Sequence, residues 1–464
     1  MKIINKIIKK FKKTDEPNKI DYLLFGIISV LLFVCFLYSD IVITTEHTLN
    51  FMDVIKSGDF MDFYKVNYNL KINGLNTTVC YDILIYFIFM IWNIPLYIAS
   101  RFMGINILKS FLCKLWLKGI VILFLYLTCK VMKKIFEELN IDKKLSKWGI
   151  LIFASSPIIF SIIFMMCQYD IIPLFFVMLG ILAYLKNEEK KFILYFMLAI
   201  PMKLFALFIF IPLLLLKEKR IFYIGTKTIC SISVLLVCRI LENFMPLYYE
   251  SVQNFNGSMI NRLSNIGFDI STGSVSIFMI LYIIICIYCY SVKFKNKKHF
   301  HDLTIYIPFI VYASLFTFFK VTHPQWYIYI TPFITIMIIK NIKNFKLNFL
   351  LEMCMSVSLI YIHFVYFWWV FDTNCITLML GKSPFKGNIV DSTNFLDLNT
   401  SFGLTKYMPI FYSIYFATIL YLAILNFPKE ESKQETVIIE RSLIWSRMAI
   451  ILPFALMLLL LYIL

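Results

Sequence analysis

Charged residues are scarce in this chain, and so are the residues that mark loops and linkers. Only 16% of the 464 residues are Asp, Glu, Lys or Arg, against about 25% in a typical globular protein. There are only 14 glycines and 14 prolines, and neither an internal repeat nor a Gly/Ser-rich linker is present. This composition excludes a disordered chain and a fibrous repeat protein, and it gives no sign of a separate soluble domain.

Apolar residues are abundant instead. The sequence is 60% hydrophobic and 18% aromatic, and its mean hydropathy is +0.78. A soluble protein of this length cannot bury so much apolar surface, because a single globular core stops growing at about 250–300 residues. The composition therefore excludes a soluble enzyme and predicts an all-α integral membrane protein with many spans.

The charge balance is strongly basic, with 45 Lys and Arg against 28 Asp and Glu and a formal net charge of +17. Most of the basic residues fall into seven clusters, at residues 1–19, 130–147, 186–191, 217–220, 293–298, 340–346 and 429–447. If these clusters face the cytoplasm, as the positive-inside rule expects, the intervening polar segments lie outside and are acidic overall. The basicity thus predicts membrane topology, and we expect no nucleic-acid partner.

Apolar runs of around 20 residues predict eleven spans, at residues 21–38, 112–129, 149–167, 169–185, 221–240, 273–292, 302–319, 326–339, 347–371, 405–426 and 443–464. Residues 192–216 lie between two basic clusters and must enter and return, which predicts two short helices meeting near Met202 and Lys203. We expect residues 79–100 to dip in from outside, because a full crossing there would put residues 130–147 on the wrong side. The total is about 13.

A long acidic loop follows the first span. It contains Asp40, Glu46, His47 and Asp53. A carboxylate held at a membrane surface can have a raised pKa and act as a general base on a hydroxyl, or it can help to bind a divalent cation. The alternative is a solvated loop whose charge opposes insertion in the wrong direction.

Two further polar groups stand between apolar runs. Gln168 and Asp170 occupy a tight turn between two spans, where they would point into an outer cavity, although Asp170 could also cap the following helix. Lys203 lies at the apex of the short helix pair, between apolar neighbours. A lysine there is costly unless it meets an anion such as a lipid-linked phosphate or extends to the outer surface.

A third polar turn, near residues 322–327, contains His323, Gln325 and Trp326. These residue types suit a sugar or phosphate site, but Trp is equally typical of the aromatic belt at a membrane interface. Arg262 is the single basic residue of the loop at 241–272. It could clamp a phosphate or be an isolated surface arginine.

Several features follow one another in a fixed order between residues 20 and 340. Asp40 follows the first span, and an outer loop at 241–272 follows the seventh. The motifs between and after them are IWNIP at 91–95, QYD at 168–170, PMKLFALFIFIPLLLLKEKR at 201–220 and HPQW at 323–326. Together these features resemble the GT-C class of integral-membrane glycosyltransferases, which use polyprenyl-phosphate-linked sugars as donors.

The resemblance implies inverting sugar transfer on the extracytoplasmic side, to an acceptor hydroxyl of a lipid-linked or cell-envelope glycan. It implies that Asp40 is the base, but the paired acids of some members are absent here, so Glu46 and Asp53 stay as alternatives. The need for a divalent cation, Mg²⁺ or Mn²⁺, also stays open. The remaining implied substrate contacts are His47, Gln168, Asp170, Lys203, Arg262, His323, Gln325 and Trp326.

The expected organisation is a GT-C-like helical bundle in three parts. Residues 1–20 form a basic cytoplasmic N-terminus, 21–272 a catalytic membrane module with outer loops 39–79 and 241–272, and 273–464 the C-terminal membrane helices with outer loop 372–404. We expect a multi-pass protein of a bacterial plasma membrane whose site faces outward. A flippase or transporter, and a polymerase or ligase of lipid-linked glycans, are the alternative functions.

Overall fold

The computed structural model describes residues 14–36, 40–72, 75–107, 109–254, 261, 263, 266–271, 273–319, 322–366, 399–428 and 439–456. These residues form helices and two short antiparallel β-hairpins, which confirms the predicted all-α class. Most of the expected outer loop at 372–404 lies outside the described residues.

The first half of the chain builds a group of short elements and then a run of apolar helices. Its elements are α2 (Lys19–Cys35), α3 (Asp40–Ser57), η1 (Phe60–Asp62), α4 (Phe63–Val66), β1 (Leu70–Ile72), β2 (Leu75–Thr77), α5 (Leu84–Arg101), α6 (Phe111–Glu138), α7 (Lys143–Ala154), α8 (Pro157–Ile159), η2 (Phe160–Met165), α9 (Ile171–Leu185), α10 (Glu189–Met202) and α11 (Phe205–Lys217). In the first hairpin Leu70 pairs with Thr77.

The second half continues the helical bundle. Its elements are α12 (Ile221–Glu242), η3 (Tyr249–Gln253), β3 (Gly267–Ile270), β4 (Gly273–Ser276), α14 (Ile277–Ser291), α15 (Lys297–Thr317), η4 (Pro324–Tyr329), α16 (Thr331–Lys340), η5 (Ile342–Asn344), α17 (Phe345–Tyr366), η8 (Leu404–Tyr407), α20 (Met408–Leu425) and α21 (Arg441–Ala449). In the second hairpin Gly267 pairs with Ser276.

Six of the described helical segments are long and apolar enough to cross a membrane. They are Leu84–Arg101, Phe111–Glu138, Ile221–Glu242, Lys297–Thr317, Ile342–Tyr366 and Leu404–Leu425. A seventh crossing results if α7 and the bent segment Pro157–Met165, which meet at 41°, count as one span. The apolar helices α9, α11 and α14 are shorter. A membrane-embedded helical protein is thus supported, whereas the total of about 13 spans stays a prediction.

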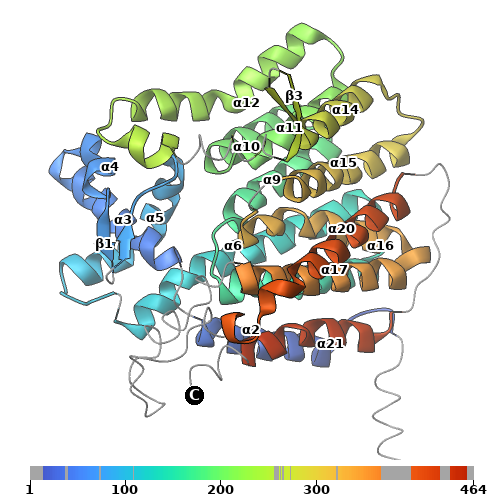
Figure 1. The fold of residues 1–464 in the computed structure, drawn as a ribbon, viewed down its shortest axis with the longest axis horizontal. Helices are drawn as coiled ribbons and strands as arrows, with labels where there is room; N and C mark the ends of the chain where they lie inside the picture. Colours follow the sequence, from blue (N-terminus) through green and yellow to red (C-terminus); the bar gives the residue numbers. More distant parts are fainter. Residues whose placement is uncertain are drawn as a thin grey trace, which may run out of the picture.

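The molecule has two visibly different parts. Figure 1 shows α3, α4, α5 and β1 gathered at one end, and we call these elements with β2 the N-terminal unit. The other helices form a bundle in which α9 packs against α6 and α10, and α17 packs against α20. Gly180 of α9 faces the ring of Phe196 in α10, and a Cβ atom there would collide with that ring. The missing side chain therefore allows the close approach of these two helices.

The pair α10 and α11 is interrupted where the sequence predicts two short helices to meet. Lys203 has an extended backbone, with φ −157° and ψ 115°, between the last residue of α10 and the start of α11. Pro201 is the last residue but one of α10 and has no backbone N–H to donate. That the pair enters and leaves on one side of the membrane remains a prediction.

One buried ion pair fastens α21 to the bundle. The guanidinium of Arg447 binds both carboxylate oxygens of Glu352 in α17, at 2.6 and 2.8 Å. Its third nitrogen donates to the carbonyl of Ile152 in α7, at 2.8 Å. The hydroxyls of Ser156 and Ser356 donate to Glu352 as well, each at 3.1 Å. Both charges are therefore fully paired, as a buried ion pair requires if it is to stabilise a fold.

Candidate functional site

An ion pair between two sequence-predicted residues forms the centre of the candidate site. Lys203 Nζ lies 3.3 Å from Asp170 Oδ1, and the side chains are 8% and 1% exposed. The extended break after α10 carries the lysine, and the turn that begins α9 carries the aspartate. Two residues more than 30 positions apart in sequence thus meet between the ends of three helices.

The structure decides between the alternatives that the sequence left open for these two residues. Asp170 occupies the N-cap position of α9, but its side chain accepts no hydrogen bond from that helix. Lys203 is buried and directed at a carboxylate, so it does not extend to the surface. The capping and snorkelling explanations are therefore wrong for these side chains. Instead, the Lys203 ammonium and the Asp170 carboxylate form an ion pair with each other.

Aromatic rings surround the lysine ammonium. Lys203 Nζ lies 4.9 Å from the ring centroid of Tyr81 and 5.9 Å from that of Trp326, within the range of cation–π attraction. The ring of His323 lies 4.9 Å from Trp326 and that of Phe205 lies 4.8 Å from it. The structure thus brings four of the predicted residues together, namely Asp170, Lys203, His323 and Trp326.

The pair is incompletely hydrogen-bonded. Neither carboxylate oxygen of Asp170 accepts a well-formed hydrogen bond from the described residues. The hydroxyl of Tyr329 lies beside this carboxylate and offers it a poorly aligned hydrogen bond. The indole nitrogen of Trp326 has no well-formed partner among the described residues. Buried polar groups without hydrogen bonds are destabilising. Such groups gathered at one place indicate a site prepared for a polar ligand.

The backbone leading to Asp170 is irregular. Residues Phe160–Met165 form a π-helix, and Cys167 has a left-handed conformation with φ 53°. Both features are uncommon, and both are found preferentially near functional sites. A β-carbon makes this conformation costly at Cys167, so the surrounding packing must enforce it. The sequence gives no signal of either feature.

Gln168 and Gln325 are both buried beside this turn. Gln168 is 2% exposed, and its backbone N–H donates to the carbonyl of Ile162 at 3.0 Å. Gln325 is 9% exposed and belongs to η4 together with Trp326. η4 contacts both α9 and η2. These amides therefore lie in the walls of the same region, in agreement with their predicted placement.

Asp40 is the first residue of α3, but its side chain lies outside the described residues. Its backbone is tied to this region by the chain, because only three residues separate it from Phe36 at the end of α2. The four Cα–Cα steps from Phe36 to Asp40 span at most about 14 Å. The role of Asp40 as base therefore stays a prediction, and its place in the chain is compatible with that role.

Lys118 joins the two segments that lead into the site. Its ammonium is fully buried and donates to the carbonyls of Phe33 and Phe36, at 3.2 and 2.7 Å, and to that of Phe164. These carbonyls belong to the ends of α2 and η2, which precede Asp40 and Asp170 respectively. Sequence reasoning missed this lysine although it stands inside a predicted span, where an ionisable residue is a signal of function.

The other acids of the first outer loop belong to a different cluster. Asp53 binds Arg101 at 2.7 Å and accepts a hydrogen bond from the Tyr97 hydroxyl at 2.8 Å. Glu46 is also close to Arg101, and burial raises the pKa of Glu46 despite that cation. Arg101 ends α5, a helix about 26 Å long that begins three residues after Tyr81. These contacts place Glu46 and Asp53 beside Arg101, and the choice of base among the three acids stays a prediction.

His47 is a buried residue of the N-terminal unit. Its Nε2 lies 3.2 Å from the hydroxyl oxygen of Thr77, and burial lowers the pKa of His47 to about 4. A neutral imidazole at physiological pH follows, held by the first β-hairpin. No described contact joins His47 to Lys203, so its predicted role in substrate binding gains no support.

Two sequence predictions, the phosphate clamp at Arg262 and the divalent-cation site, find no support in the described residues. Arg262 lies outside the described residues, so its role as a phosphate clamp stays a prediction. Among the residues that the structure describes, no three His, Cys, Asp or Glu side chains are grouped as a metal site would require. The divalent cation likewise stays an open prediction.

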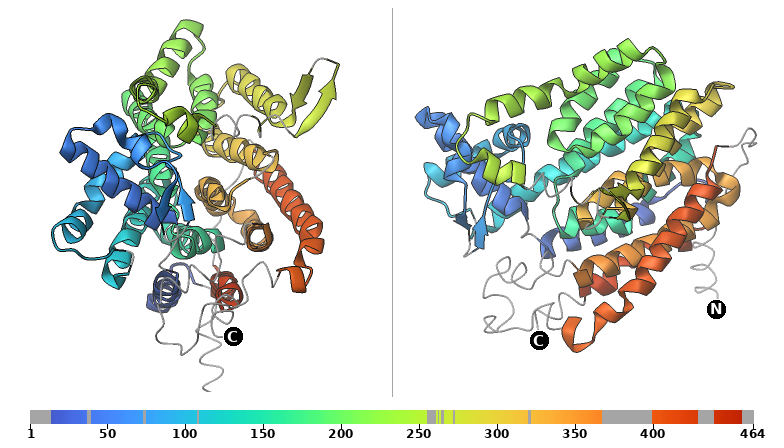
Figure 2. Two further views of the ribbon diagram at one scale, coloured as in Figure 1. Left: turned by 60° about the vertical axis from the view of Figure 1, so that its left-hand side comes forward. Right: turned by 45° about the horizontal axis from the view of Figure 1, so that its top comes forward.

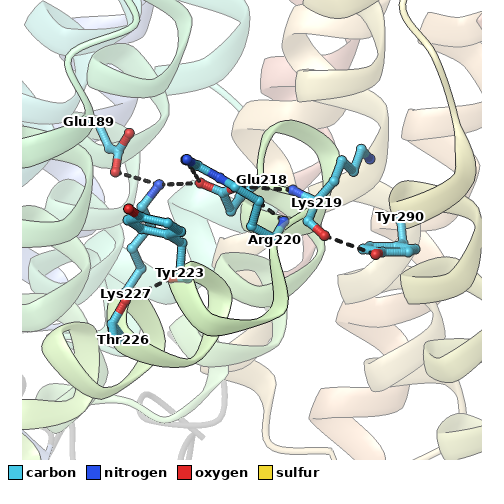
Figure 3. A network of polar contacts seen from close by, with 8 residues as sticks. All are labelled: Glu189, Glu218, Lys219, Arg220, Tyr223, Thr226, Lys227 and Tyr290. Atoms are coloured by element: carbon cyan, nitrogen blue, oxygen red, sulfur yellow. Dashed lines mark hydrogen bonds and ion pairs between the residues drawn. The ribbon is translucent and has the colours of Figure 1, made fainter.

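The opposite ends of α10 and α11 are joined by a second polar network (Figure 3). Lys227 of α12 binds Glu189, the first residue of α10, at 2.7 Å and Glu218, which follows α11, at 2.9 Å. Arg220 binds Glu218 as well, at 2.9 Å. A cavity of about 180 Å³ adjoins this network. Because one lysine bridges both helix ends, it restrains the hairpin that carries Lys203 at its other end.

The sequence matches no protein-family model, and neither a curated protein nor a solved structure shows significant similarity to it. The functional argument therefore rests on the residues and contacts described above.

Proposed function

We propose that this protein is a membrane glycosyltransferase of the GT-C type, which moves a sugar from a polyprenyl-phosphate donor to an acceptor hydroxyl on the extracytoplasmic side. The observation that carries the proposal is the buried Lys203 ammonium, placed against Asp170 and between the rings of Tyr81 and Trp326. A buried cation with an incompletely bonded partner suits a site that receives an anion. The aromatic rings offer flat walls for the sugar attached to that phosphate.

The proposed reaction is a direct displacement. The acceptor hydroxyl oxygen attacks the anomeric carbon, the bond from that carbon to the phosphate oxygen breaks, and the configuration inverts. The hydroxyl proton passes to a carboxylate, which we assign to Asp40. Negative charge develops on the departing phosphate, and Lys203 and His323 lie where they would stabilise it. No strong general acid is required, because a phosphate leaves readily as an anion.

The proposal includes the orientation. The Lys203 end of the bundle would face outward, because the basic clusters near residues 186–191 and 217–220 lie at the other ends of α10 and α11. We place the protein in a bacterial plasma membrane, where it would meet its lipid-linked donor and a lipid-linked or cell-envelope glycan acceptor.

The proposal is tested by transfer from synthetic polyprenyl-phosphate sugars, with purified wild-type protein and the Asp40→Asn variant compared. The readout is release of polyprenyl phosphate and labelling of a lipid or glycan acceptor. Wild-type transfer, with a loss of at least 100-fold in the variant, is expected for removal of a general base. No transfer with any donor would reject the enzyme, and movement of intact donor across vesicles would favour a flippase. Full activity in Asp40→Asn would reject only the assigned base.

A further inference from the structure

Three consecutive residues, Tyr81 to Ile83, form one wall of the candidate site. They connect the first β-hairpin with α5. The ring of Tyr81 lies 4.9 Å from Lys203 Nζ, and it packs edge-on against Tyr169 with ring centroids 5.5 Å apart. The position of this wall therefore sets how much of the lysine a ligand can reach.

Each of these three residues is held by a bond from another element. The backbone N–H of Ile83 donates to Glu242 Oε1, at the end of α12. The hydroxyl of Tyr64 lies 2.9 Å from the same carboxylate oxygen and 3.2 Å from the carbonyl oxygen of Tyr81. The hydroxyl of Tyr248 donates to Asp82 Oδ1 at 3.1 Å. The end of α12 is thus the main attachment of the wall.

Burial of the Glu242 carboxyl group costs more free energy than a purely structural contact would require. It is fully buried, and its second oxygen, Oε2, accepts no well-formed hydrogen bond from the described residues, although the Tyr248 hydroxyl lies close to this carboxyl group. Asp82 is buried nearby, and the closest cation, Arg239, lies 3.6 Å from Asp82 Oδ2. Burial raises the pKa of Asp82, and Arg239 opposes that rise. Two buried carboxyl groups with one cation are costly to keep unless their geometry serves a purpose.

We infer that Glu242 is a positioning residue, which holds Tyr81 against Lys203 and so shapes the donor-phosphate site. The inference rests on the proposed function only for its effect on transfer, since the contact itself is independent of the reaction. Glu242 lies two residues after the predicted span at 221–240 and is the last residue of α12.

The test compares Glu242→Ala with Glu242→Gln, which keeps an acceptor oxygen, and with Glu250→Ala, an exposed control eight residues further along the chain. Amide hydrogen exchange is measured on peptides covering residues 79–86 in the full-length protein. Exchange is expected to rise about tenfold in Glu242→Ala and to stay near the wild-type rate in the other two. Unchanged exchange in Glu242→Ala would overturn the inference, whether or not the protein transfers sugar.

Kinetics provide a readout that mere destabilisation would not move. On the proposed function, Tyr81 contacts the bound donor equally in the ground state and in the transition state. Glu242→Ala should therefore raise KM for the donor about tenfold and change kcat less than threefold. Combining it with Tyr81→Ala should add little to the effect of Tyr81→Ala alone. Fully additive effects would contradict the inference. If Glu242→Ala does not fold, Tyr64→Phe removes one link without leaving a carboxylate unpaired and should give the same pattern more weakly.

Discussion

Two buried ion pairs in this protein differ in how completely their charges are satisfied. Glu352 and Arg447 are 3% and 1% exposed, and every charged group of the pair is hydrogen-bonded. Asp170 and Lys203 are also buried, at 1% and 8% exposure, but a single 3.3 Å contact joins them and the carboxylate oxygens accept no well-formed hydrogen bond from the described residues. Both pairs are thus buried, but only the Glu352–Arg447 pair has its hydrogen bonds complete.

The Glu352–Arg447 pair is bonded as expected for a contact that joins helices. The Asp170–Lys203 pair is bonded as expected for groups that interact with a ligand. A satisfied pair loses much if either partner leaves, since several hydrogen bonds are lost together. On the proposed function, a donor phosphate would take the place of the carboxylate beside Lys203, and only one direct contact between the paired charges would be broken. The first arrangement is suited to stability and the second to binding.

The largest expected effect concerns the satisfied pair. Replacement of Arg447 by Met leaves Glu352 buried without its cation and should lower the free energy of unfolding by about 3–5 kcal/mol. Thermal and denaturant unfolding in detergent would measure this loss. The matched control, Glu352→Leu with Arg447→Met, removes both charges and should lose clearly less. Equal losses in the single and double variants would show that unpaired charge is not the cause.

His47 is buried as well, and among the residues that the structure describes it has one side-chain hydrogen-bond partner, Thr77, and no counter-charge. Its pKa of about 4 lies below the unfolded value near 6.5, so the unfolded state binds more protons between these values. The His47 contribution is present above about pH 6.5 and is lost as pH falls. Between pH 7 and pH 5 the loss should be about 2 kcal/mol.

Unfolding curves at these two pH values check this expectation, with His47→Gln compared with the wild type. The variant should lose less stability over the interval. His299→Gln is the control, because His299 is a partly exposed histidine in the first turn of α15, away from the N-terminal unit. A wild-type dependence in His47→Gln would assign the loss to other groups.

For the Asp170–Lys203 pair, removal of one charge is expected to strengthen ligand binding, whereas removal of Arg447 is expected to weaken the fold. In Asp170→Asn the lysine keeps its place but loses its anionic competitor, so polyprenyl phosphate should bind about three- to tenfold more tightly. Equilibrium binding of the labelled lipid measures this change. Asp302→Asn, which alters the Asp302–Lys340 pair elsewhere in the bundle, should leave binding unchanged. Weaker binding by Asp170→Asn would mean that the carboxylate itself contacts the ligand.

Much of the site could be predicted because polar residues stand where they are costly. Asp170, Lys203 and the turn with Trp326 are conspicuous in an apolar sequence, and the break near Lys203 follows from the charge clusters on both sides. Their mutual contact could not be derived, because it depends on how α9, α10 and η4 pack. The π-helix before Asp170 has no sequence signature at all.

Other residues carried a signal that was not used. Lys118 and Glu352 stand inside predicted spans, and Glu242 lies two residues after one, so the argument made for Lys203 applies to each of them. By contrast, Glu46 and Asp53 were grouped with Asp40 because they share one loop. The helix α3 instead turns them toward Arg101, and only the tertiary structure shows this.

The most direct test of the account replaces the Lys203–Asp170 pair by apolar residues, in Lys203→Met with Asp170→Leu, and measures both unfolding and sugar transfer. Apolar replacement of a buried pair is often neutral for stability, so the free energy of unfolding should stay within about 1 kcal/mol of the wild type. Transfer from the polyprenyl-phosphate sugar should fall at least 100-fold. A double variant that folds and transfers sugar at the wild-type rate would contradict the account.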